Sequence, residues 1–380
     1  MKGERNKIAF LFGAGISKIS TKTITAAIGR DEINIDQPDY KKKKEQAVTS
    51  FIKLLKIKIE EYYFEKFKKV RYEASYEDIY SLIKEIEDHI DGFYGFVPIE
   101  IFLKEIYPEV FLILRQSGGH ENKTSMAPIS DLSKLCDMAM IRIECIVGKL
   151  LSDLSDYPFD NLCFLKTAVE KYSPDNIDIF TLNHDLLLET YLQKENVAFI
   201  NGIDVNGKWN NKLFDSSDGK VRLYKLHGSI EWKNTFLHTP MKQENICVST
   251  NGKITSGDED RSVILIGTKN KILDYYKWNI FTELHQRFKE SLYRTKKLII
   301  SGYSFGDDGI NVRIVDWLVG DSKERNAIII DPNPDDLFYK RPNELQNALS
   351  RGQIKIFKNK IEEIKWNEIE KDLKVQIDRS

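Results

Sequence analysis

Four short polar motifs hold the residues of this chain whose types and spacing could support chemistry. They occupy residues 11–17 (LFGAGIS), 181–185 (TLNHD), 225–229 (KLHGS) and 302–307 (GYSFGD). The first, second and fourth follow runs of β-branched or aromatic residues, which is typical of buried strands in parallel sheets. Open α/β sheets bind their ligands at the carboxyl ends of strands. The motifs therefore predict one pocket for a dinucleotide, with a histidine at its chemical end.

The glycine-rich turn at Gly13, Ala14 and Gly15 suits a phosphate group. Glycine lets the backbone approach a pyrophosphate closely, and the amides at the start of a helix attract its charge. Ser17 adds a hydroxyl group to the same turn. A plain tight turn between a strand and a helix is the alternative. If the turn binds phosphate, a bulky side chain at Gly15 is expected to weaken ligand binding more than folding.

Asn183 and Asp185 place an amide and a carboxylate directly after the apolar run 177–182. These groups can hydrogen-bond a ribose hydroxyl or a carboxamide. The alternative is an Asx turn in which Asp185 caps the next helix and His184 is a turn residue.

His227 lies beside Gly228 at the end of another apolar run and is a candidate general base, because imidazole titrates near neutrality. The alternative is a structural histidine bonded to the backbone. The remaining histidines have no comparable setting; they are His89, His120, His238 and His285.

Polar residues also follow the apolar runs 297–301 and 327–330. In a doubly wound sheet these positions would hold the adenosine half of a dinucleotide, with an acidic group on a ribose. A simple turn at 331–334 is the alternative for the second set. The residues are Gly302, Ser304 and Asp307 after the first run, and Asp331 and Asn333 after the second.

The apolar runs that predict strands span residues 7–12, 177–182, 223–226, 263–266, 297–301, 327–330 and 353–357. Helical patterns, for example over 280–292 and 310–318, separate most of them. Strands that alternate with helices predict a mostly parallel sheet covered on both faces. We therefore expect an α/β protein with a Rossmann-like, doubly wound sheet.

Residues 37–155 predict a large helical domain inserted into this sheet. Helical stripes span residues 51–62, 79–90 and 135–154, and few strand signals interrupt them. The polar residues 36–44 are the expected linker, and the core would comprise residues 1–36 and 156–380. The three long amphipathic stripes exceed what covering one sheet edge requires, and four aromatic residues lie close enough in sequence to leave some outside the core: Tyr62, Tyr63, Phe64 and Phe67. We therefore expect this domain to form an oligomer or partner surface.

Composition narrows the class of protein. With 57 Lys+Arg and 58 Asp+Glu the formal net charge is −1, which argues against non-specific electrostatic binding of nucleic acid. The 4 cysteines lack metal-ligand spacing and are interpreted as buried free thiols in a reducing compartment, with no metal. No apolar run is long enough to span a membrane and no cleavage site follows the first strand, so we expect a cytoplasmic protein.

In this order, the motifs resemble those of the sirtuin family, in particular the divergent prokaryotic sirtuin-like domains of anti-phage defence proteins. Residues 13–17 (GAGIS) resemble the family's phosphate loop, and 181–185 resemble its Thr-Gln-Asn-Ile-Asp segment, which lines the nicotinamide and its ribose. His227 and Gly228 resemble its catalytic His-Gly pair. Residues 302–304 resemble its adenosine-side Gly-Thr-Ser. The likeness covers residues 7–17 and about 177–360.

The chain also departs from that family. Leu182 replaces a glutamine, His184 replaces an apolar residue, and no Pro-Asp-Phe-Arg segment follows Ser17. The zinc module, made of two Cys-x-x-Cys pairs, is absent from the sequence. These losses are similar to those of members that hydrolyse NAD rather than deacylate proteins. Such members often act beside a partner, for example an ATPase of the HerA type.

The resemblance implies NAD glycohydrolase activity. His227 would act on a ribose hydroxyl and Asn183 would position the ribose or a water, while Asp185 would hold the carboxamide beside Thr181. Gly13, Ala14, Gly15 and Ser17 would bind the pyrophosphate, and Gly302, Ser304 and Asp331 the adenosine half. The alternatives are an NAD-dependent protein deacylase and a non-catalytic nucleotide sensor.

Overall fold

The chain folds into two compact units. The computed structural model describes residues 7–17, 21–28, 39–67, 72–92, 97–116, 127–153, 157–216, 218–234, 246–248, 262–267, 278–320, 325–334 and 343–375. The sheet unit comprises Met1–Lys18, Leu151–Ile264 and Tyr275–Ser380, and the helical unit comprises Ile19–Leu150 and Leu265–Asp274. The predicted insertion, 37–155, shares residues 37–150 with the helical unit, which in addition takes in 19–36 and 265–274.

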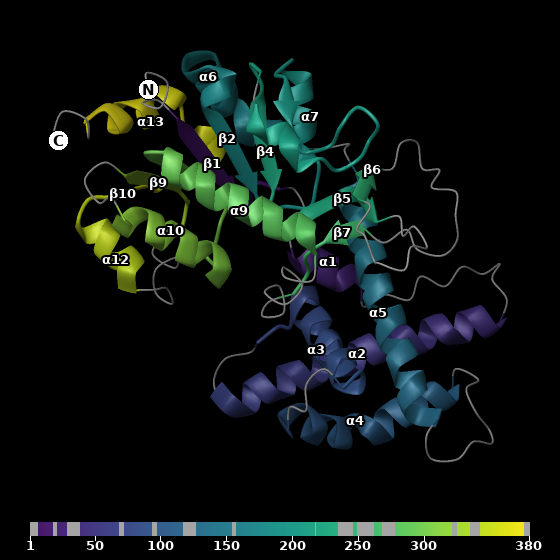
Figure 1. Ribbon diagram of the computed structural model, residues 1–380. Helices are drawn as coiled ribbons and strands as arrows, with labels where there is room; N and C mark the ends of the chain where they lie inside the picture. The colour runs from purple at the N-terminus through teal and green to yellow at the C-terminus, as the bar shows by residue number, and fades with distance from the viewer. Residues whose placement is uncertain are drawn as a thin grey trace. The chain divides into compact units, whose positions relative to one another are not determined.

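A parallel sheet forms the centre of the sheet unit (Figure 1). In the described part of the chain it has 7 strands in the order β10-β9-β8-β1-β2-β4-β3. Each neighbouring pair is parallel. The strands are β1 (Ile8–Phe12), β2 (Ile177–Thr181), β3 (Phe199–Ile200), β4 (Val221–Lys225), β8 (Lys297–Ser301), β9 (Asn326–Ile330) and β10 (Ile354–Phe357). This arrangement confirms the predicted Rossmann-like, doubly wound α/β fold.

The chain reverses its direction across the sheet between β1 and β8. From β1 it moves through β2 to β4 and β3 on one side, and it then returns to place β8, β9 and β10 on the other side. At such a switch point the loops leave the two central strands in opposite directions, which opens a crevice at their carboxyl ends. The glycine turn after β1 and the motif at 302–307 both start at this point.

Helices cover both faces of the sheet. On one face Phe10 and Phe12 of β1 pack with apolar residues of α6 (Cys163–Tyr172), α7 (Leu187–Lys194) and α13 (Trp366–Val375). On the other, Phe180 of β2 contacts Phe288 of α9 (Asn279–Arg294), which packs beside α10 (Asp308–Gly320) and crosses in front of the sheet in Figure 1. Helix α12 (Asn343–Ser350) packs on β10 and α10. Short 3₁₀ turns complete the unit at Ala14–Ile16, Phe159–Leu162, Pro174–Asn176, Asn211–Asp215 and Ile361–Glu363.

A small antiparallel sheet lies beside the parallel one, with the order β6-β5-β7. It comprises β5 (Gly228–Asn234), β6 (Ile246–Val248) and β7 (Ser262–Ile264). The apolar run at 263–266 was expected in the parallel sheet, and that expectation is wrong. Pairing with β5 satisfies the backbone of β7 just as well, and an apolar run does not reveal which neighbour it pairs with.

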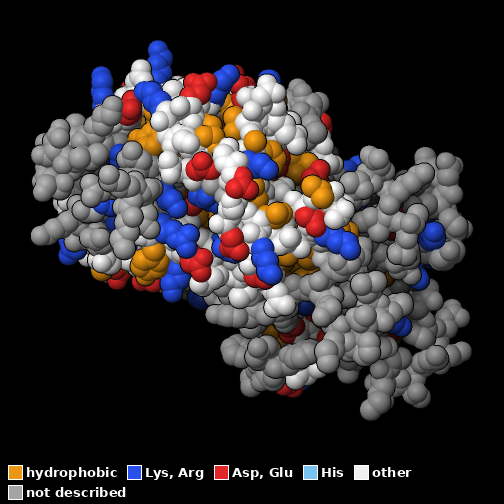
Figure 2. Space-filling model, turned by 45° about the horizontal axis from the view of Figure 1, so that its top comes forward, with side chains coloured by type: hydrophobic (Ala, Val, Ile, Leu, Met, Phe, Trp, Pro, Cys, Tyr) orange, Lys and Arg blue, Asp and Glu red, His pale blue; other side chains and the backbone are white. Residues whose placement is uncertain are grey.

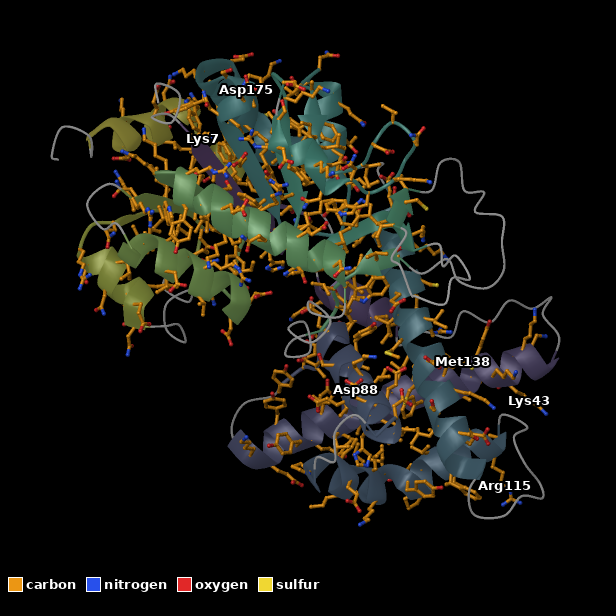
Figure 3. The ribbon with its side chains drawn as sticks, in the orientation of Figure 1. Lys7, Lys43, Asp88, Arg115, Met138 and Asp175 are labelled. Atoms are coloured by element: carbon orange, nitrogen blue, oxygen red, sulfur yellow. The ribbon has the colours of Figure 1, made fainter. Side chains whose placement is uncertain are left out.

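The helical unit contains α1 (Thr21–Ile28), α2 (Asp39–Phe67), α3 (Tyr76–Ile90), α4 (Val97–Gln116) and most of α5 (Ala127–Leu151). The predicted stripes lie on α2, α3 and α5, whereas α4 was not predicted. The expected linker is wrong from Asp39 onward, because lysine is a good helix former and residues 41–44 lie in α2. Asp88 is buried on α3, where Lys84 lies 3.9 Å from its carboxylate (Figure 3).

Surface features agree only partly with the sequence analysis. All 4 cysteines are free thiols, but Cys145 and Cys163 are exposed, so the expected burial is wrong for these two. Lys/Arg and Asp/Glu side chains are interspersed over the face of the molecule seen in Figure 2. Within the described ranges no helix is both long and apolar enough for a membrane span, and no cluster of His, Cys, Asp or Glu side chains could hold a metal ion.

Candidate functional site at the switch point

The glycine turn after β1 is held by backbone hydrogen bonds to the loop after β8. The Gly13 amide donates to the Ser301 carbonyl at 3.0 Å, and the Gly15 amide donates to the Gly302 carbonyl at 2.8 Å. Within the turn, the Ile16 amide donates to Gly13 and the Ser17 amide donates to Ala14. A pyrophosphate that used these amides would have to replace those bonds. Ala14 and Gly15 are nevertheless exposed, so a ligand can approach this turn.

The glycines at 13 and 15 are required because two backbones touch. A Cβ atom on Gly13 would lie 2.5 Å from the Gly302 carbonyl oxygen, and one on Gly15 would lie 2.7 Å from the Gly302 Cα. Gly302 itself has φ +64°, a conformation that L residues rarely adopt. A bulky residue at Gly15 would push apart the loops of two central strands, so it should disturb folding as well as any ligand binding.

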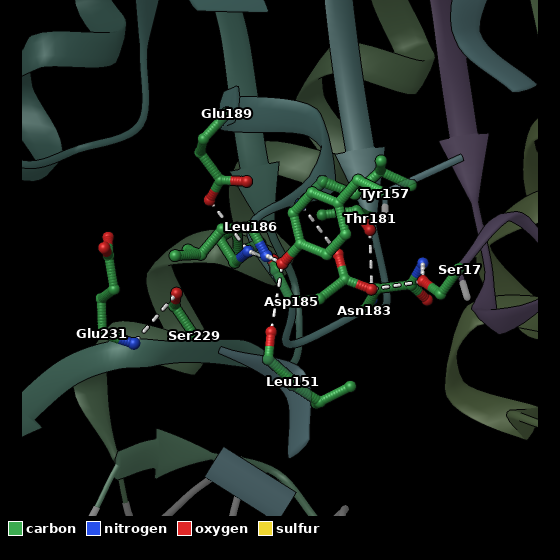
Figure 4. Close-up of polar contacts among 12 residues, drawn as sticks. Ser17, Leu151, Tyr157, Thr181, Asn183, Asp185, Leu186, Glu189, Ser229 and Glu231 are labelled. Atoms are coloured by element: carbon green, nitrogen blue, oxygen red, sulfur yellow. Dashed lines mark hydrogen bonds and ion pairs between the residues drawn. The ribbon is translucent and has the colours of Figure 1, made fainter. Parts of the chain in front are cut away.

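Ser17, Asn183 and Asp185 form one polar cluster that joins the ends of β1 and β2 (Figure 4). The Asn183 side-chain amide donates to the Gly13 carbonyl at 3.0 Å and to Ser17 Oγ at 2.9 Å. Ser17 Oγ in turn donates to the Asp185 carboxylate. With both hydrogens of its amide used in this way, Asn183 presents its carbonyl Oδ1 as an acceptor. Asn183 and Asp185 are buried, whereas Ser17 is half-buried.

The Asx-turn interpretation of Asp185 describes its local structure. Its Oδ1 accepts from the Leu187 amide at 3.1 Å, which is the Asx turn of the alternative interpretation, while its other oxygen accepts from Ser17. Thr181 is 1% exposed, and its hydroxyl accepts from the Asn183 amide at 3.1 Å. Thr181 therefore holds the backbone of the loop that follows β2.

A buried ion pair between β4 and α7 stabilises the loop that follows β2. Lys225, the last residue of β4, is 1% exposed. Its Nζ lies 2.9 Å from Oε1 of Glu189 on α7, and it also donates to the backbone carbonyl of Asp185. The Tyr157 hydroxyl accepts from the Leu186 amide at 3.1 Å, and burial raises the pKa of this hydroxyl. Sequence analysis did not assign Lys225 a role, because a lysine is normally exposed.

His227 occupies the turn between β4 and β5 and is 4% exposed. The Leu226 amide beside it donates to the Thr181 carbonyl at 2.9 Å, which places His227 next to the end of β2. Gly228 has φ +84°, and a Cβ there would lie 2.0 Å from the Val263 carbonyl oxygen. Glycine must follow the histidine because β7 passes directly beside this turn.

Three side chains from other segments surround His227. The ring centroid of His184 lies 6.3 Å away and that of His285 lies 6.5 Å away. His227 Nε2 lies 3.1 Å from Oδ2 of Asp307. Sequence analysis gave His184 and His285 no role; both are buried beside the candidate base, so that interpretation of His285 is wrong.

His285 is held neutral at physiological pH. It lies on α9, where burial and the neighbouring charges of His227 and Arg313 lower its pKa to about 3. Its Nε2 is 3.2 Å from the Leu226 carbonyl oxygen, which ties α9 to the residue before His227. His285 therefore supports the turn and is not a proton acceptor near neutrality.

The expected adenosine-side residues lie further along the same edge. Ser304 is exposed and lies two residues after Gly302. Asp331 follows β9, one strand beyond β8, and its Oδ1 accepts from the Asn333 amide at 2.7 Å. The alternative turn interpretation of this segment therefore describes its local structure.

The structure thus gathers Ser17, Asn183 and Asp185 in one cluster and joins it to His227 through His184. Acceptors, donors and an imidazole at one sheet edge fit the hydroxyl and amide groups of a nicotinamide nucleoside. The space beside Gly13 and Gly15 is filled by the Gly302 backbone, so these glycines are explained by loop packing. The polar side chains therefore fit the nicotinamide nucleoside part of a dinucleotide.

A polar pocket of about 390 Å³ lies at the opposite edge of the sheet, near Lys7 and Asp175 (Figure 3). Two of its arginines are paired within the protein: Arg222 pairs with Asp178, and Arg287 lies 2.6 Å from Asp215. A ligand that used these arginines would have to displace their partners.

The fold and the site define a Rossmann-like protein with a polar, histidine-containing site at its topological switch point. Residues 178–356 match the family described as the SIR2-like domain. The match includes Asn183, Asp185, His227 and Asp307, and supports a sirtuin-like family and an NAD-related activity. A search of curated proteins found no match to the chain.

Proposed function

We propose that this chain is an NAD glycohydrolase that cleaves the bond between nicotinamide and ribose to give nicotinamide and ADP-ribose. The proposal rests mainly on one observation: Asn183, Asp185 and His227 lie together at the carboxyl ends of β2 and β4 within a SIR2-like match. NAD supplies its own leaving group, the cationic nicotinamide, so positioning can supply much of the rate.

Each residue has a role that its position allows. Asn183 Oδ1 accepts from a ribose hydroxyl or the attacking water, because both amide hydrogens already bind Gly13 and Ser17. Asp185 is fixed by Ser17 and Leu187, and it orients the carboxamide. His227 acts on a ribose hydroxyl as base or orienting group. Burial of these groups excludes water that would weaken their hydrogen bonds.

Incubation of the purified full chain with NAD, followed by product chromatography, tests the proposal. We expect nicotinamide and ADP-ribose from the wild type, and a loss of about 10²-fold or more in Asn183→Ala or His227→Ala. Exposed Asn347→Ala on α12 and half-buried His89→Ala on α3 are matched controls that should keep wild-type turnover.

The outcomes separate the alternatives. NAD binding by calorimetry without turnover, in the chain alone and with its genomic neighbour, would favour a nucleotide sensor. Turnover that requires an acetyl-lysine peptide would favour the deacylase. Turnover that survives in the double variant Asn183→Ala/His227→Ala would contradict the assigned residues, since residues that act as a unit lose activity together.

We further propose that the enzyme serves anti-phage defence as an oligomer with a partner ATPase of the HerA type, without direct nucleic-acid binding. Apolar side chains exposed on α2 and α4 of the helical unit support a protein contact there. They are Ile57 51%, Tyr62 56%, Phe64 62%, Ile101 61%, Tyr107 38%, Phe111 49% and Leu112 56%. Co-purification of the partner with the wild type, and its loss with Phe64→Ser or Leu112→Ser, tests this contact.

A further inference from the structure

The acid at the end of the 302–307 motif faces the candidate base and not the adenosine side. Asp307 Oδ2 lies 3.1 Å from His227 Nε2, and the side chain of Asp307 is 18% exposed. The two residues come from opposite sides of β1 and β2, since His227 follows β4 and Asp307 follows β8. Only the fold brings them together.

The two oxygens of the Asp307 carboxylate have different partners. Oδ1 accepts from the Ile310 amide at 3.1 Å and so caps α10, which leaves Oδ2 directed at the histidine. The positive end of the α10 dipole lies beside this carboxylate and favours its ionised form. Since Oδ2 lies within hydrogen-bond distance of Nε2 and can only accept, it favours the imidazole tautomer with the proton on Nε2, which makes Nδ1 the basic nitrogen.

The loop that carries Asp307 is held by its own hydrogen bonds. The Tyr303 hydroxyl donates to the Asp307 carbonyl at 3.0 Å and lies 2.8 Å from Asn311 Oδ1. The Asn311 side-chain amide donates to the Phe305 carbonyl at 2.9 Å. Phe305 is fully buried with φ +55°, a strained conformation that persists only where the surroundings impose it. The loop therefore presents the carboxylate in one fixed place.

We propose that Asp307 is the positioning residue of His227: it fixes the ring and its tautomer, and it stabilises the imidazolium that forms when Nδ1 takes a proton from a ribose hydroxyl. This inference rests on the proposed hydrolysis of NAD for its catalytic part. The proton moves from the hydroxyl oxygen to Nδ1 and returns when the product leaves, so the residue pair is unchanged over one turnover.

Other groups also face His227 and set its charge balance. His184 approaches from the loop after β2 and His285 from α9, while Arg313 on α10 acts on His285. Each of these is neutral or cationic, whereas the Asp307 carboxylate beside the ring is an anion. Removal of its charge should therefore make the imidazolium harder to form.

Asp307→Asn tests the proposal, because asparagine still caps a helix and keeps the shape of the side chain. Titration of histidine resonances by NMR should show the His227 signal, assigned by its absence in His227→Ala, shifted to lower pH by about 1 unit or more. In the activity assay kcat should fall about 10²-fold with little change in KM, and the acid limb of the pH profile should move to lower pH. Asp308→Asn, an exposed neighbour in the first turn of α10, is the matched control and should do neither.

Two results would overturn the proposal. One is a His227 titration that is the same in wild type and Asp307→Asn. The other is a kcat loss from Asp307→Asn that is as large in the His227→Ala background as in the wild type, since a residue that acts through His227 has no further effect without it. If the wild type does not turn over NAD, the hydrolase assignment fails, and the NMR titration still decides whether Asp307 controls the histidine.

Discussion

Replacement of Lys225 by methionine should strongly destabilise the sheet unit. Methionine keeps the length of the side chain but removes the cation that pairs with Glu189 at 2.9 Å. The pair is almost fully removed from water, with side-chain exposures of 1% and 10%. The second oxygen of Glu189, Oε2, is buried and has no hydrogen-bond partner among the described residues. In Lys225→Met the whole carboxylate is therefore left without a counter-charge.

The expected cost follows from this burial. Breaking a buried ion pair by removing one partner costs about 3–5 kcal/mol, because an uncompensated charge remains. At about 1.4 kcal/mol per tenfold, that is roughly a 10²- to 10⁴-fold change in the unfolding equilibrium. The Asp185 carbonyl also loses its lysine donor, which costs about 1 kcal/mol more. Lys225→Met/Glu189→Gln should recover most of the loss except this last part.

Tryptophan fluorescence in urea measures the effect selectively, since all 5 tryptophans lie within the ranges of the sheet unit. Lys171→Met is the matched control: its partner Glu370 is 2.6 Å away but the lysine side chain is 38% exposed, so its loss should cost about 0–1 kcal/mol. A Lys225→Met midpoint equal to that of Lys171→Met would refute the reasoning, as would a double variant that is no more stable than Lys225→Met.

The pH dependence provides a second check. Without its lysine, the Glu189 carboxylate is a buried charge with no partner, and burial favours the protonated form of a carboxyl group. The deficit of Lys225→Met should then be small below about pH 4 and should grow as pH rises, by at most about 1.4 kcal/mol per unit. A deficit that does not change with pH would mean that lost packing, and not the charge, causes it.

Three further predictions concern other parts of the chain. Gly13→Ala should destabilise the sheet unit by about 1–3 kcal/mol in urea unfolding, because its Cβ would lie 2.5 Å from the Gly302 carbonyl oxygen. Gly306→Ala is the control and should not destabilise the unit, since its Cβ would lie 3.5 Å from the nearest atom. Equal unfolding midpoints for the two variants would contradict the loop contact. His285 has a folded pKa of about 3, below its usual 6.5, so the free energy of unfolding should decrease as pH falls from about 6.5 toward 3. In His285→Leu this decrease with pH should be less steep. An equally steep decrease would show that His285 is not the group responsible. Phe64→Ser should reduce the molar mass of the assembly in light scattering if the exposed face of α2 is an interface, and an unchanged mass would remove this face from the proposal.

Local patterns were enough to locate most strands of the parallel sheet and the ends at which the site forms. The runs at 7–12, 177–182 and 297–301 became β1, β2 and β8, because a strand buried on both faces must be apolar throughout. The glycines, Asn183, Asp185 and His227 could be selected since polar groups directly after such runs are at the ligand-binding edge of the sheet.

Only the tertiary structure decided what each of these groups contacts. That Gly13 and Gly15 pack on Gly302 depends on β1 lying next to β8, and nothing in the sequence between them encodes this order. The burial of Lys225 and the position of His285 beside His227 also depend on strand order and helix packing. A local hydrophobic pattern does not reveal which distant segment covers a residue. The partners of a polar group are set by strand order and helix packing, and these depend on the whole chain.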